Sequence, residues 1–138
     1  MQYSFSYFKN SMPAWKRKKD PILTKLFYRP VSFFLAGICA RLGIQANTVS
    51  YMSIIVAVTA CALFVIPYNH YAHIAGAILI NVWGIMDCID GNLARAVKKQ
   101  PFGEFADGIS SYILVGLMCI GMSMCVYFSG GVLVAKEV

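Results

Sequence analysis

The chain has 138 residues, enough for one domain, and 59% of them are hydrophobic while only 13% are charged. Soluble domains carry about 25% charged residues, so this composition excludes a soluble globular protein and indicates that lipid is part of the solvent. The net charge is +6. The cations flank apolar segments, so membrane topology explains them better than nucleic-acid binding, which needs a basic surface on a soluble fold.

The first predicted element is an amphipathic helix over residues 20–42. Asp20, followed by proline, is typical of a helix start, with a capping carboxylate and a proline at the first helical position. A second proline, Pro30, predicts an interruption. The uncharged stretch 31–40 is too short for a transmembrane helix, which needs about 20 residues. We therefore expect this segment to lie in the membrane interface.

Three membrane-spanning helices are predicted next, over residues 48–66, 72–96 and 103–129. The first is uncharged and follows Asn47, a residue type that commonly caps helix N-termini. In the second, a span of about 20 residues counted from Tyr71 places Asp87 and Asp90 near the edge of the bilayer. The sequence thus predicts an all-α fold, a multi-span integral membrane helical bundle with an N-terminal interfacial amphipathic helix, as one domain over 1–138.

The positions of Lys and Arg predict the orientation. These residues are concentrated before residue 47 and near the loop that holds Lys98 and Lys99, whereas the loop between the first two spans has none. By the positive-inside rule the cation-rich segments face the cytoplasm. We expect a multi-pass integral membrane protein whose N terminus and acidic residues both lie on the cytoplasmic side.

Four of the six acidic residues fall in one short window, at the ends of the second and third spans. Residues three, four and seven apart share one face of a helix, and two sets have this spacing. They are Asp87, Asp90, Gly91 and Ala94 on the second helix, with Arg95 at the margin, and Glu104, Asp107, Gly108 and Ser111 on the third. The short loop between the helices can turn these faces toward each other, and their small residues leave room for a bulky ligand.

Carboxylates that gather at low dielectric repel one another unless positive charge lies between them. Arg95 supplies one such charge, and a bound divalent cation would supply the rest of the positive charge. Carboxylate ligands favour Mg²⁺, Mn²⁺ or Ca²⁺ over zinc, and such ions commonly also hold substrate phosphates. The residues alone therefore predict a metal site for a diphosphate-bearing substrate at the membrane surface.

Seven residues of this region, in order, resemble the signature of the CDP-alcohol phosphatidyltransferases, in which D-x-x-D-G-x-x-A-R is followed by G-x-x-x-D-x-x-x-D. In this chain the seven are Asp87, Asp90, Gly91, Ala94, Arg95, Gly103 and Asp107. Upstream, Asn47 and Ser50 are similar to the family's P-N-x-x-T segment. The chain departs from the pattern at Ser111, which stands where the family has a fourth aspartate.

The resemblance implies a metal-dependent enzyme of phospholipid biosynthesis. Such an enzyme moves a phosphatidyl or other substituted phosphate group from a CDP-alcohol, such as CDP-diacylglycerol, to an acceptor alcohol and releases CMP. Mg²⁺ or Mn²⁺ would be the cofactor, and the signature residues would divide into two groups. The metal ligands would be Asp87, Asp90 and Asp107, and the substrate-binding residues would be Gly91, Ala94 and Arg95.

The resemblance also implies partners and a longer protein. Family members usually span the membrane six times and are commonly homodimers, embedded in membrane lipid. We therefore expect this chain to be an N-terminal portion or a shortened relative, with a second copy as its partner.

Catalysis depends on the fourth aspartate position. In the family that residue is regarded as a metal ligand and as the base that activates the acceptor, whereas a serine hydroxyl cannot be a base near neutral pH. We expect Glu104, two turns before Ser111 on the same face, to share this role; the alternative is that Glu104 is a helix N-terminal acid favoured by the helix dipole. One alternative, favoured by Ser111, is a catalytically weak relative that binds CDP and metal. Another is an ion- or proton-coupled transporter, since acids in spans also form relays. Gly91 and Arg95 argue against a relay, which does not need them.

Overall fold

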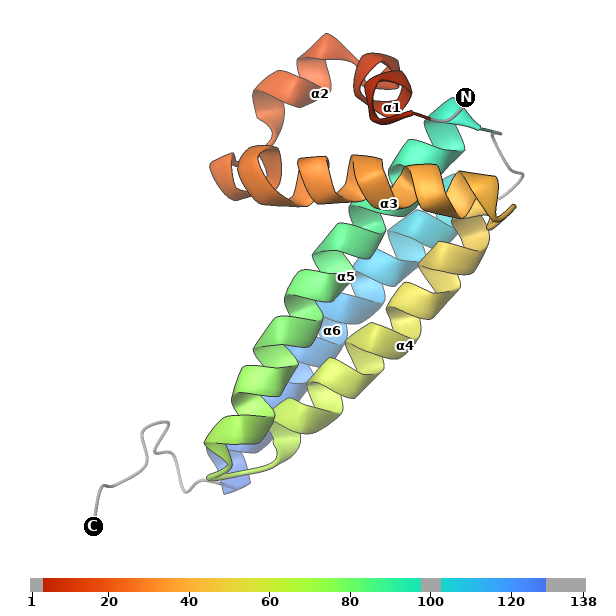
Figure 1. The fold of residues 1–138 in the computed structure, drawn as a ribbon. Helices are drawn as coiled ribbons and strands as arrows, with labels where there is room; N and C mark the ends of the chain where they lie inside the picture. Colours follow the sequence, from red (N-terminus) through yellow and green to blue (C-terminus); the bar gives the residue numbers. More distant parts are fainter. Residues whose placement is uncertain (1–3, 98–102, 129–138) are drawn as a thin grey trace.

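The computed structural model describes residues 4–97 and 103–128, with the side chains of these ranges except those at 16, 17 and 103–107. Both ranges are helical and contain no strand. Three helices are long and apolar enough to cross a membrane, and a shorter helix lies across one end of their bundle (Figure 1). The three are α4 (Ala46–Val65), α5 (His70–Ala96) and α6 (Gly103–Phe128). The predicted all-α, multi-span fold is confirmed.

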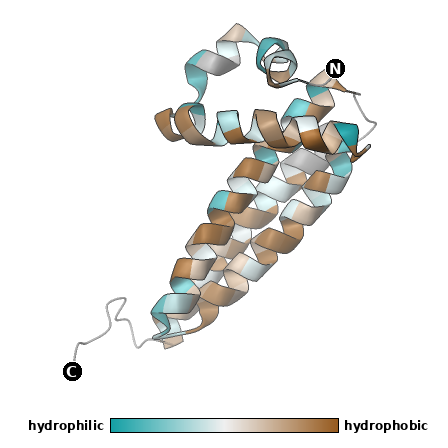
Figure 2. Ribbon diagram, viewed as in Figure 1, coloured by the Kyte–Doolittle hydropathy of each residue, from teal (hydrophilic) through white to brown (hydrophobic). Residues whose placement is uncertain are grey.

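The N-terminal segment contributes four shorter elements. They are α1 (Phe5–Ser11), α2 (Ala14–Lys19), the π-helix η1 (Thr24–Tyr28) and α3 (Arg29–Arg41), which is the helix that crosses the end of the bundle. Figure 2 shows hydrophilic residues in α1 and α2 and near the ends of the bundle, with hydrophobic residues along much of α3 and along the length of the bundle. That the segment lies in the membrane interface stays a prediction.

Helix α4 is the centre of the bundle. It packs along both α5 and α6, whereas α5 and α6 meet over few residues. Its buried face consists of small side chains at helical spacing, including Ser50, Ser53, Ala57 and Ala60. Glycines of α5 and α6 pack against α4. A Cβ on Gly76 would lie 3.0 Å from the Phe64 ring, and one on Gly121 would lie 2.8 Å from Cys61 Sγ. Small residues of this kind let membrane helices approach closely.

Two helix starts differ from the sequence predictions. The N-cap of α4 is Gln45, which has an extended backbone (φ −86°, ψ 154°) and makes no side-chain capping bond. The prediction that Asn47 caps this helix is therefore wrong, because an N-cap residue needs a non-helical backbone and Asn47 lies inside the first turn. Helix α5 begins at His70, where Asn69 Oδ1 accepts a 3.0 Å hydrogen bond from the Ala72 amide.

The interruption predicted at Pro30 does not occur. The chain is helical from residue 22 to residue 41, and it passes through the π turn η1. The Arg29 amide donates to the carbonyl of Thr24, five residues earlier. Pro30 follows directly after this π turn, in the first turn of α3, and a local π adjustment of this kind lets a helix accommodate a proline, which has no N–H to donate.

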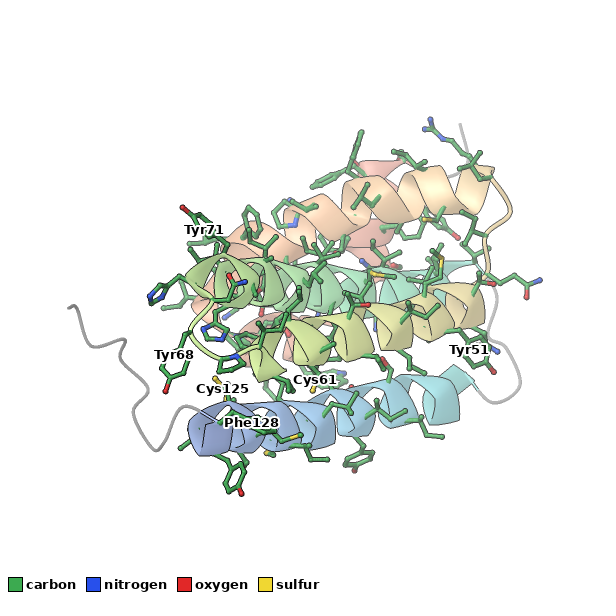
Figure 3. The ribbon with its side chains drawn as sticks, turned by 90° about the horizontal axis from the view of Figure 1, so that it is seen from below. Tyr51, Cys61, Tyr68, Tyr71, Cys125 and Phe128 are labelled. Carbon is green, nitrogen blue, oxygen red and sulfur yellow. The ribbon has the colours of Figure 1, made fainter. Side chains whose placement is uncertain are left out.

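A buried apolar cluster fixes the N-terminal helices to the bundle. It joins α1, α3, α4 and α5, and its members include Phe8, Phe33, Ala36, Val49 and Leu93. Figure 3 shows Tyr68, Tyr71 and Phe128 at the end of the bundle away from Tyr51. Aromatic residues near both ends are typical of helices that cross a bilayer. The packing therefore holds the N-terminal segment against the end of α5 that carries the signature.

Candidate functional site

A cavity of about 310 Å³ lies between the signature part of α5 and the N-terminal segment. Asp87, Gly91 and Arg95 line it together, because residues four apart follow one face of a helix. The other wall comes from around η1 and consists of Asp20, Pro21, Thr24, Tyr28 and Arg29. Three signature residues thus share a cavity with a segment that the signature does not include.

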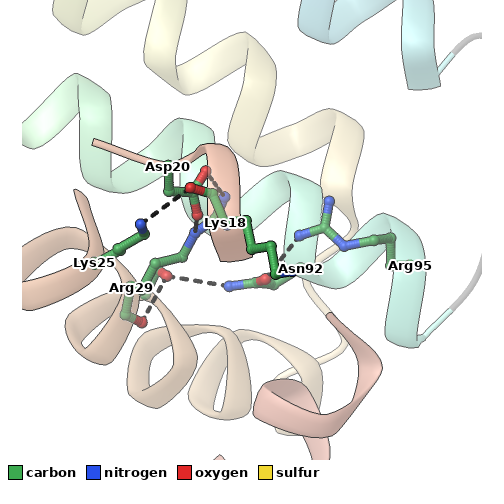
Figure 4. A network of polar contacts seen from close by, with 7 residues as sticks. Lys18, Asp20, Lys25, Arg29, Asn92 and Arg95 are labelled. Carbon is green, nitrogen blue, oxygen red and sulfur yellow. Dashed lines mark hydrogen bonds and ion pairs between the residues drawn. The ribbon is translucent and has the colours of Figure 1, made fainter. Parts of the chain in front are cut away.

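The buried side-chain amide of Asn92 holds the Arg95 guanidinium over Gly91. A Cβ on Gly91 would lie 3.3 Å from Arg95 Nη1, so the absence of a side chain there makes room for the guanidinium. Arg95 Nη2 donates a 2.9 Å hydrogen bond to Oδ1 of Asn92, and Asn92 Nδ2 donates to Ser32 Oγ at 3.1 Å (Figure 4). Asn92 is fully buried, so this network positions Arg95 relative to α3.

On the opposite wall, Asp20 and Arg29 form a two-bond ion pair. Arg29 Nε donates to Asp20 Oδ2 at 2.8 Å and Nη2 donates to Oδ1 at 3.2 Å (Figure 4). Their side chains are only 12% and 9% exposed. The Arg29 carbonyl accepts a 2.9 Å bond from Ser32, which also accepts from Asn92. A continuous set of hydrogen bonds therefore connects the two arginines of the cavity.

Asp90 faces α4 and is 3% exposed. Its Oδ2 accepts a 2.7 Å hydrogen bond from Ser50 Oγ. Asn47 lies one turn before Ser50, and its Oδ1 is buried and accepts no hydrogen bond from the described residues. Asp87 and Asp90, although one turn apart, thus have different surroundings, the cavity for the first and the α4 interface for the second.

The start of α6 is tied to both other spanning helices through Ser110. Its Oγ lies 2.6 Å from Ser53 Oγ and accepts a 3.2 Å bond from Trp83 Nε1. Ser111 is half-buried. The side chains of Glu104 and Asp107 lie outside the described residues. Since α6 begins at Gly103, the backbone of the third-helix part of the signature is at the same end of the bundle as Asp87 (Figure 1).

Ala94 is expected to contribute to substrate binding, and this stays a prediction. It packs against the buried apolar cluster and is not among the residues that line the cavity.

Sequence reasoning missed three residues that the structure makes important here, Asn92, Ser110 and Arg29. A signal existed for Asn92, because an uncharged amide within an apolar helix must find hydrogen-bond partners.

The residues present fit a hard divalent cation. Among the side chains that the structure describes, no three His, Cys, Asp or Glu residues gather at one point. Asp87 and Asp90 nevertheless provide carboxylates on adjacent turns, and Asn47 provides a buried oxygen without a hydrogen bond from the described residues. A donor set of oxygens suits Mg²⁺ or Mn²⁺ rather than zinc. A carboxylate from α6 would complete it.

A comparison with protein families matches residues 44–136 to the CDP-alcohol phosphatidyltransferase family. No curated protein and no solved structure matches the chain. The matched range is more than half of the chain and contains α4, α5, α6 and the whole signature. The resemblance based on the signature is confirmed, and with it the class of activity, that of a membrane transferase of phospholipid synthesis. The chain therefore belongs to the CDP-alcohol phosphatidyltransferase family.

Proposed function

We propose that this chain binds a CDP-alcohol and transfers its phosphatidyl or other substituted phosphate group to an acceptor alcohol, with release of CMP. CDP-diacylglycerol is the donor we favour. The observation that supports this most is the cavity in which Asp87, Gly91 and Arg95 lie along one wall. These residues supply the carboxylate and the guanidinium that a metal-bound diphosphate requires, and Gly91 makes room for the guanidinium.

Arg95 would hold a phosphate of the donor. A guanidinium has five N–H donors in a planar fork that matches phosphate geometry. Arg95 can therefore keep its bond to Asn92 while it donates to a phosphate oxygen. Because Asn92 is itself bonded to α3, the guanidinium is positioned before the substrate arrives. Gly91 contributes by leaving space for this side chain.

Asp87, Asp90 and Asp107 would hold Mg²⁺ or Mn²⁺. When bound, the metal would neutralise charge on the diphosphate and on the departing CMP. Ser50 orients Asp90 from α4. Ala94 would contribute to the nucleotide site only through its place in the helix, since its side chain packs on the apolar cluster.

Glu104 would take the proton of the acceptor alcohol. It precedes Ser111 by seven residues in α6, so both fall on one helical face. Ser111 cannot accept that proton near neutral pH. A second candidate function follows from the same residue: a membrane protein that binds CDP and metal but transfers poorly.

We place the site on the cytoplasmic side, with α3 and η1 in the membrane interface. Large apolar side chains of this segment are exposed, among them Leu26, Phe27 and Phe34, as expected for a face that meets lipid. The basic run before Asp20 would contact anionic headgroups. A second copy of the chain would be the partner within the membrane.

The proposed function is tested by CMP release from CDP-diacylglycerol in detergent, with a panel of acceptor alcohols and fixed Mg²⁺. We expect metal-dependent release that Asp87→Asn lowers by about 10²-fold or more, because electrostatic stabilisation is the main catalytic term in phosphoryl transfer. Glu137→Gln, a carboxylate outside the family match, serves as the control and should behave as wild type. Release that Asp87→Asn leaves unchanged would overturn the proposal. Binding of CDP without release for every acceptor would favour the second candidate.

A further inference from the structure

The cavity wall formed by residues 20–29 lies outside the range that matches the family, which begins at residue 44. This wall contains a buried ion pair, Asp20 with Arg29, and both residues line the cavity. Buried ion pairs contribute little to stability, because desolvation of the two charges offsets their attraction. The presence of this one beside the signature residues therefore calls for a role other than holding the fold.

The backbone around the ion pair is also unusual. Thr24, Tyr28 and Arg29 line the cavity, and all three lie in or directly after the π turn η1. Single π turns inside helices are rare and occur frequently at functional sites. Tyr28 is fixed by a 2.6 Å hydrogen bond from its hydroxyl to Asn81 Oδ1 of α5. This bond holds the π turn against α5, and Arg29, the next residue, lines the cavity.

The cavity has one guanidinium for each phosphate group of a diphosphate. Two guanidiniums, Arg29 and Arg95, stand on opposite walls, and two carboxylates, Asp20 and Asp87, accompany them. A diphosphate has two phosphate groups to bond. Asp87 is one of the expected metal ligands, whereas Asp20 bonds to Arg29 through both its oxygens. Two oxygens of an entering phosphate could accept from the Arg29 guanidinium side by side, as the two oxygens of Asp20 do.

We propose that Arg29 is a second phosphate-binding residue of this cavity, and that Asp20 holds it in place until the phosphate arrives. On binding, a phosphate oxygen replaces at least one oxygen of Asp20 at the guanidinium. This inference rests on the proposed function, because the ligand is the diphosphate of the CDP-alcohol. It makes the N-terminal segment half of the substrate site.

The exchange predicts opposite effects for the two members of the pair. Arg29→Gln removes a charged donor to phosphate and should lower the affinity for CDP on the order of ten-fold. Asp20→Asn removes the competitor and leaves a buried guanidinium without its carboxylate. It should lower the thermal stability of the ligand-free protein, raise the affinity for CDP and enlarge the stabilisation that CDP provides.

The experiment is a titration of the full chain in detergent with CDP at fixed Mg²⁺, together with thermal unfolding with and without CDP. The variants are Arg29→Gln, Arg29→Lys, Asp20→Asn and the double variant Asp20→Asn/Arg29→Gln. Arg41→Gln is the matched control, since Arg41 is exposed at the far end of the same helix and does not line the cavity. It should bind CDP as wild type does. Arg95→Gln is the reference for a phosphate contact of the signature itself.

The double variant keeps the test valid if Arg29→Gln does not fold, because it removes both charges and leaves no unpaired carboxylate. It should be folded and bind CDP more weakly than wild type. The inference is overturned if the double variant binds CDP as tightly as wild type, or if Asp20→Asn weakens binding. A lipid headgroup offers the same phosphate chemistry, so the titration is repeated with phosphatidylglycerol added. An effect of Arg29→Gln that appears only with this lipid would assign Arg29 to the headgroup and overturn the assignment to CDP.

The two proposals can fail separately. If wild type binds CDP and Arg95→Gln weakens binding while Arg29→Gln does not, the proposed function stands and the role of Arg29 is refuted. If wild type does not bind CDP at all, both are refuted.

Discussion

Ser50 of α4 donates a 2.7 Å hydrogen bond to the carboxyl group of Asp90 on α5, and both side chains are buried. The bond connects the upstream Asn47–Ser50 segment to the second aspartate of the signature. It fixes which way Asp90 points, because a buried carboxyl oxygen without a partner would cost free energy. The two sequence segments that resemble the family thus meet as neighbouring side chains of one site.

We predict that Ser50→Ala lowers the free energy of unfolding by about 1–3 kcal/mol, the usual cost of leaving a buried acceptor without its donor. It should also weaken CDP binding, because Asp90 loses its orientation. Ser50→Thr retains the hydroxyl and should behave nearly as wild type. Thr59→Ala is the control on the same helix, since Thr59 is exposed and its hydroxyl donates within α4, to the Ile55 carbonyl. Thermal unfolding in detergent and CDP titration measure both effects, and equal behaviour of Ser50→Ala and Thr59→Ala would contradict the role of this bond.

Close packing of α4 and α6 predicts that Gly121→Ala destabilises the bundle. The new Cβ would lie 2.8 Å from Cys61 Sγ and 3.3 Å from the Cys61 carbonyl oxygen, so the Cys61 side chain or the helices must shift. Overpacking of this kind costs about 1–3 kcal/mol. Gly116→Ala is the matched control on α6, because among the described residues nothing lies within 4 Å of its added Cβ. Alanine there should be neutral or slightly stabilising. A thermal unfolding temperature for Gly121→Ala at or above that of Gly116→Ala would show that this contact does not limit the packing.

The architecture could be predicted because long apolar runs require helices in a membrane. The all-α fold and its three apolar helices follow from uncharged stretches alone. The exact start of α4 and the effect of Pro30 depend on backbone geometry that cannot be inferred from the sequence. Asn47 is a favoured capping residue, yet the backbone turns at Gly43, with φ +72°, so that Gln45 takes the capping position. Pro30 predicts a break, but the π turn before it places this proline in a first helical turn.

The site could be predicted on α5 and less well elsewhere. The spacing of Asp87, Gly91 and Arg95 places them on one face, and they do line a common cavity. The opposite wall could not be predicted, since the pairing of Asp20 with Arg29 depends on how the chain reverses between α2 and η1. Lys25 Nζ supports that reversal with a 3.2 Å bond to the Lys18 carbonyl (Figure 4). No pattern of residue types foretells such a contact.

The serine at the fourth aspartate position predicts a specific pair of kinetic effects. Ser111→Asp should raise the rate of CMP release, because a carboxylate can accept the acceptor's proton and a serine cannot. Glu104→Gln should lower the rate in the native background far more than in the Ser111→Asp background. General-base assistance is typically worth about 10²–10⁴ in rate, so the difference is measurable. CMP formation with several acceptor alcohols at fixed Mg²⁺ gives the rates, and full activity of Glu104→Gln would exclude a catalytic role for Glu104.

The distribution of cations predicts the topology. A cysteine introduced as Lys98→Cys should face the cytoplasm, and one introduced as His70→Cys should face outside, because the loop between α4 and α5 has no Lys or Arg. Both are labelled in a background that lacks the five native cysteines, with a maleimide that does not cross membranes. Permeabilised cells, in which both positions should react, control for reactivity. Labelling of Lys98→Cys from outside intact cells would reverse the assigned orientation.

The central claim, that the acidic end of α5 holds a metal with a CDP group, is tested most directly by equilibrium binding. CDP is titrated into wild type and Asp90→Asn in detergent, with Mg²⁺ or Mn²⁺ and again with the metal chelated. We predict that wild type binds CDP at least about ten-fold more tightly with metal, and that Asp90→Asn removes most of this difference while it remains folded. Asp90→Asn keeps an oxygen that can accept from Ser50, so its fold should persist. Equal CDP affinity with and without metal, or an unchanged metal effect in Asp90→Asn, would contradict the account.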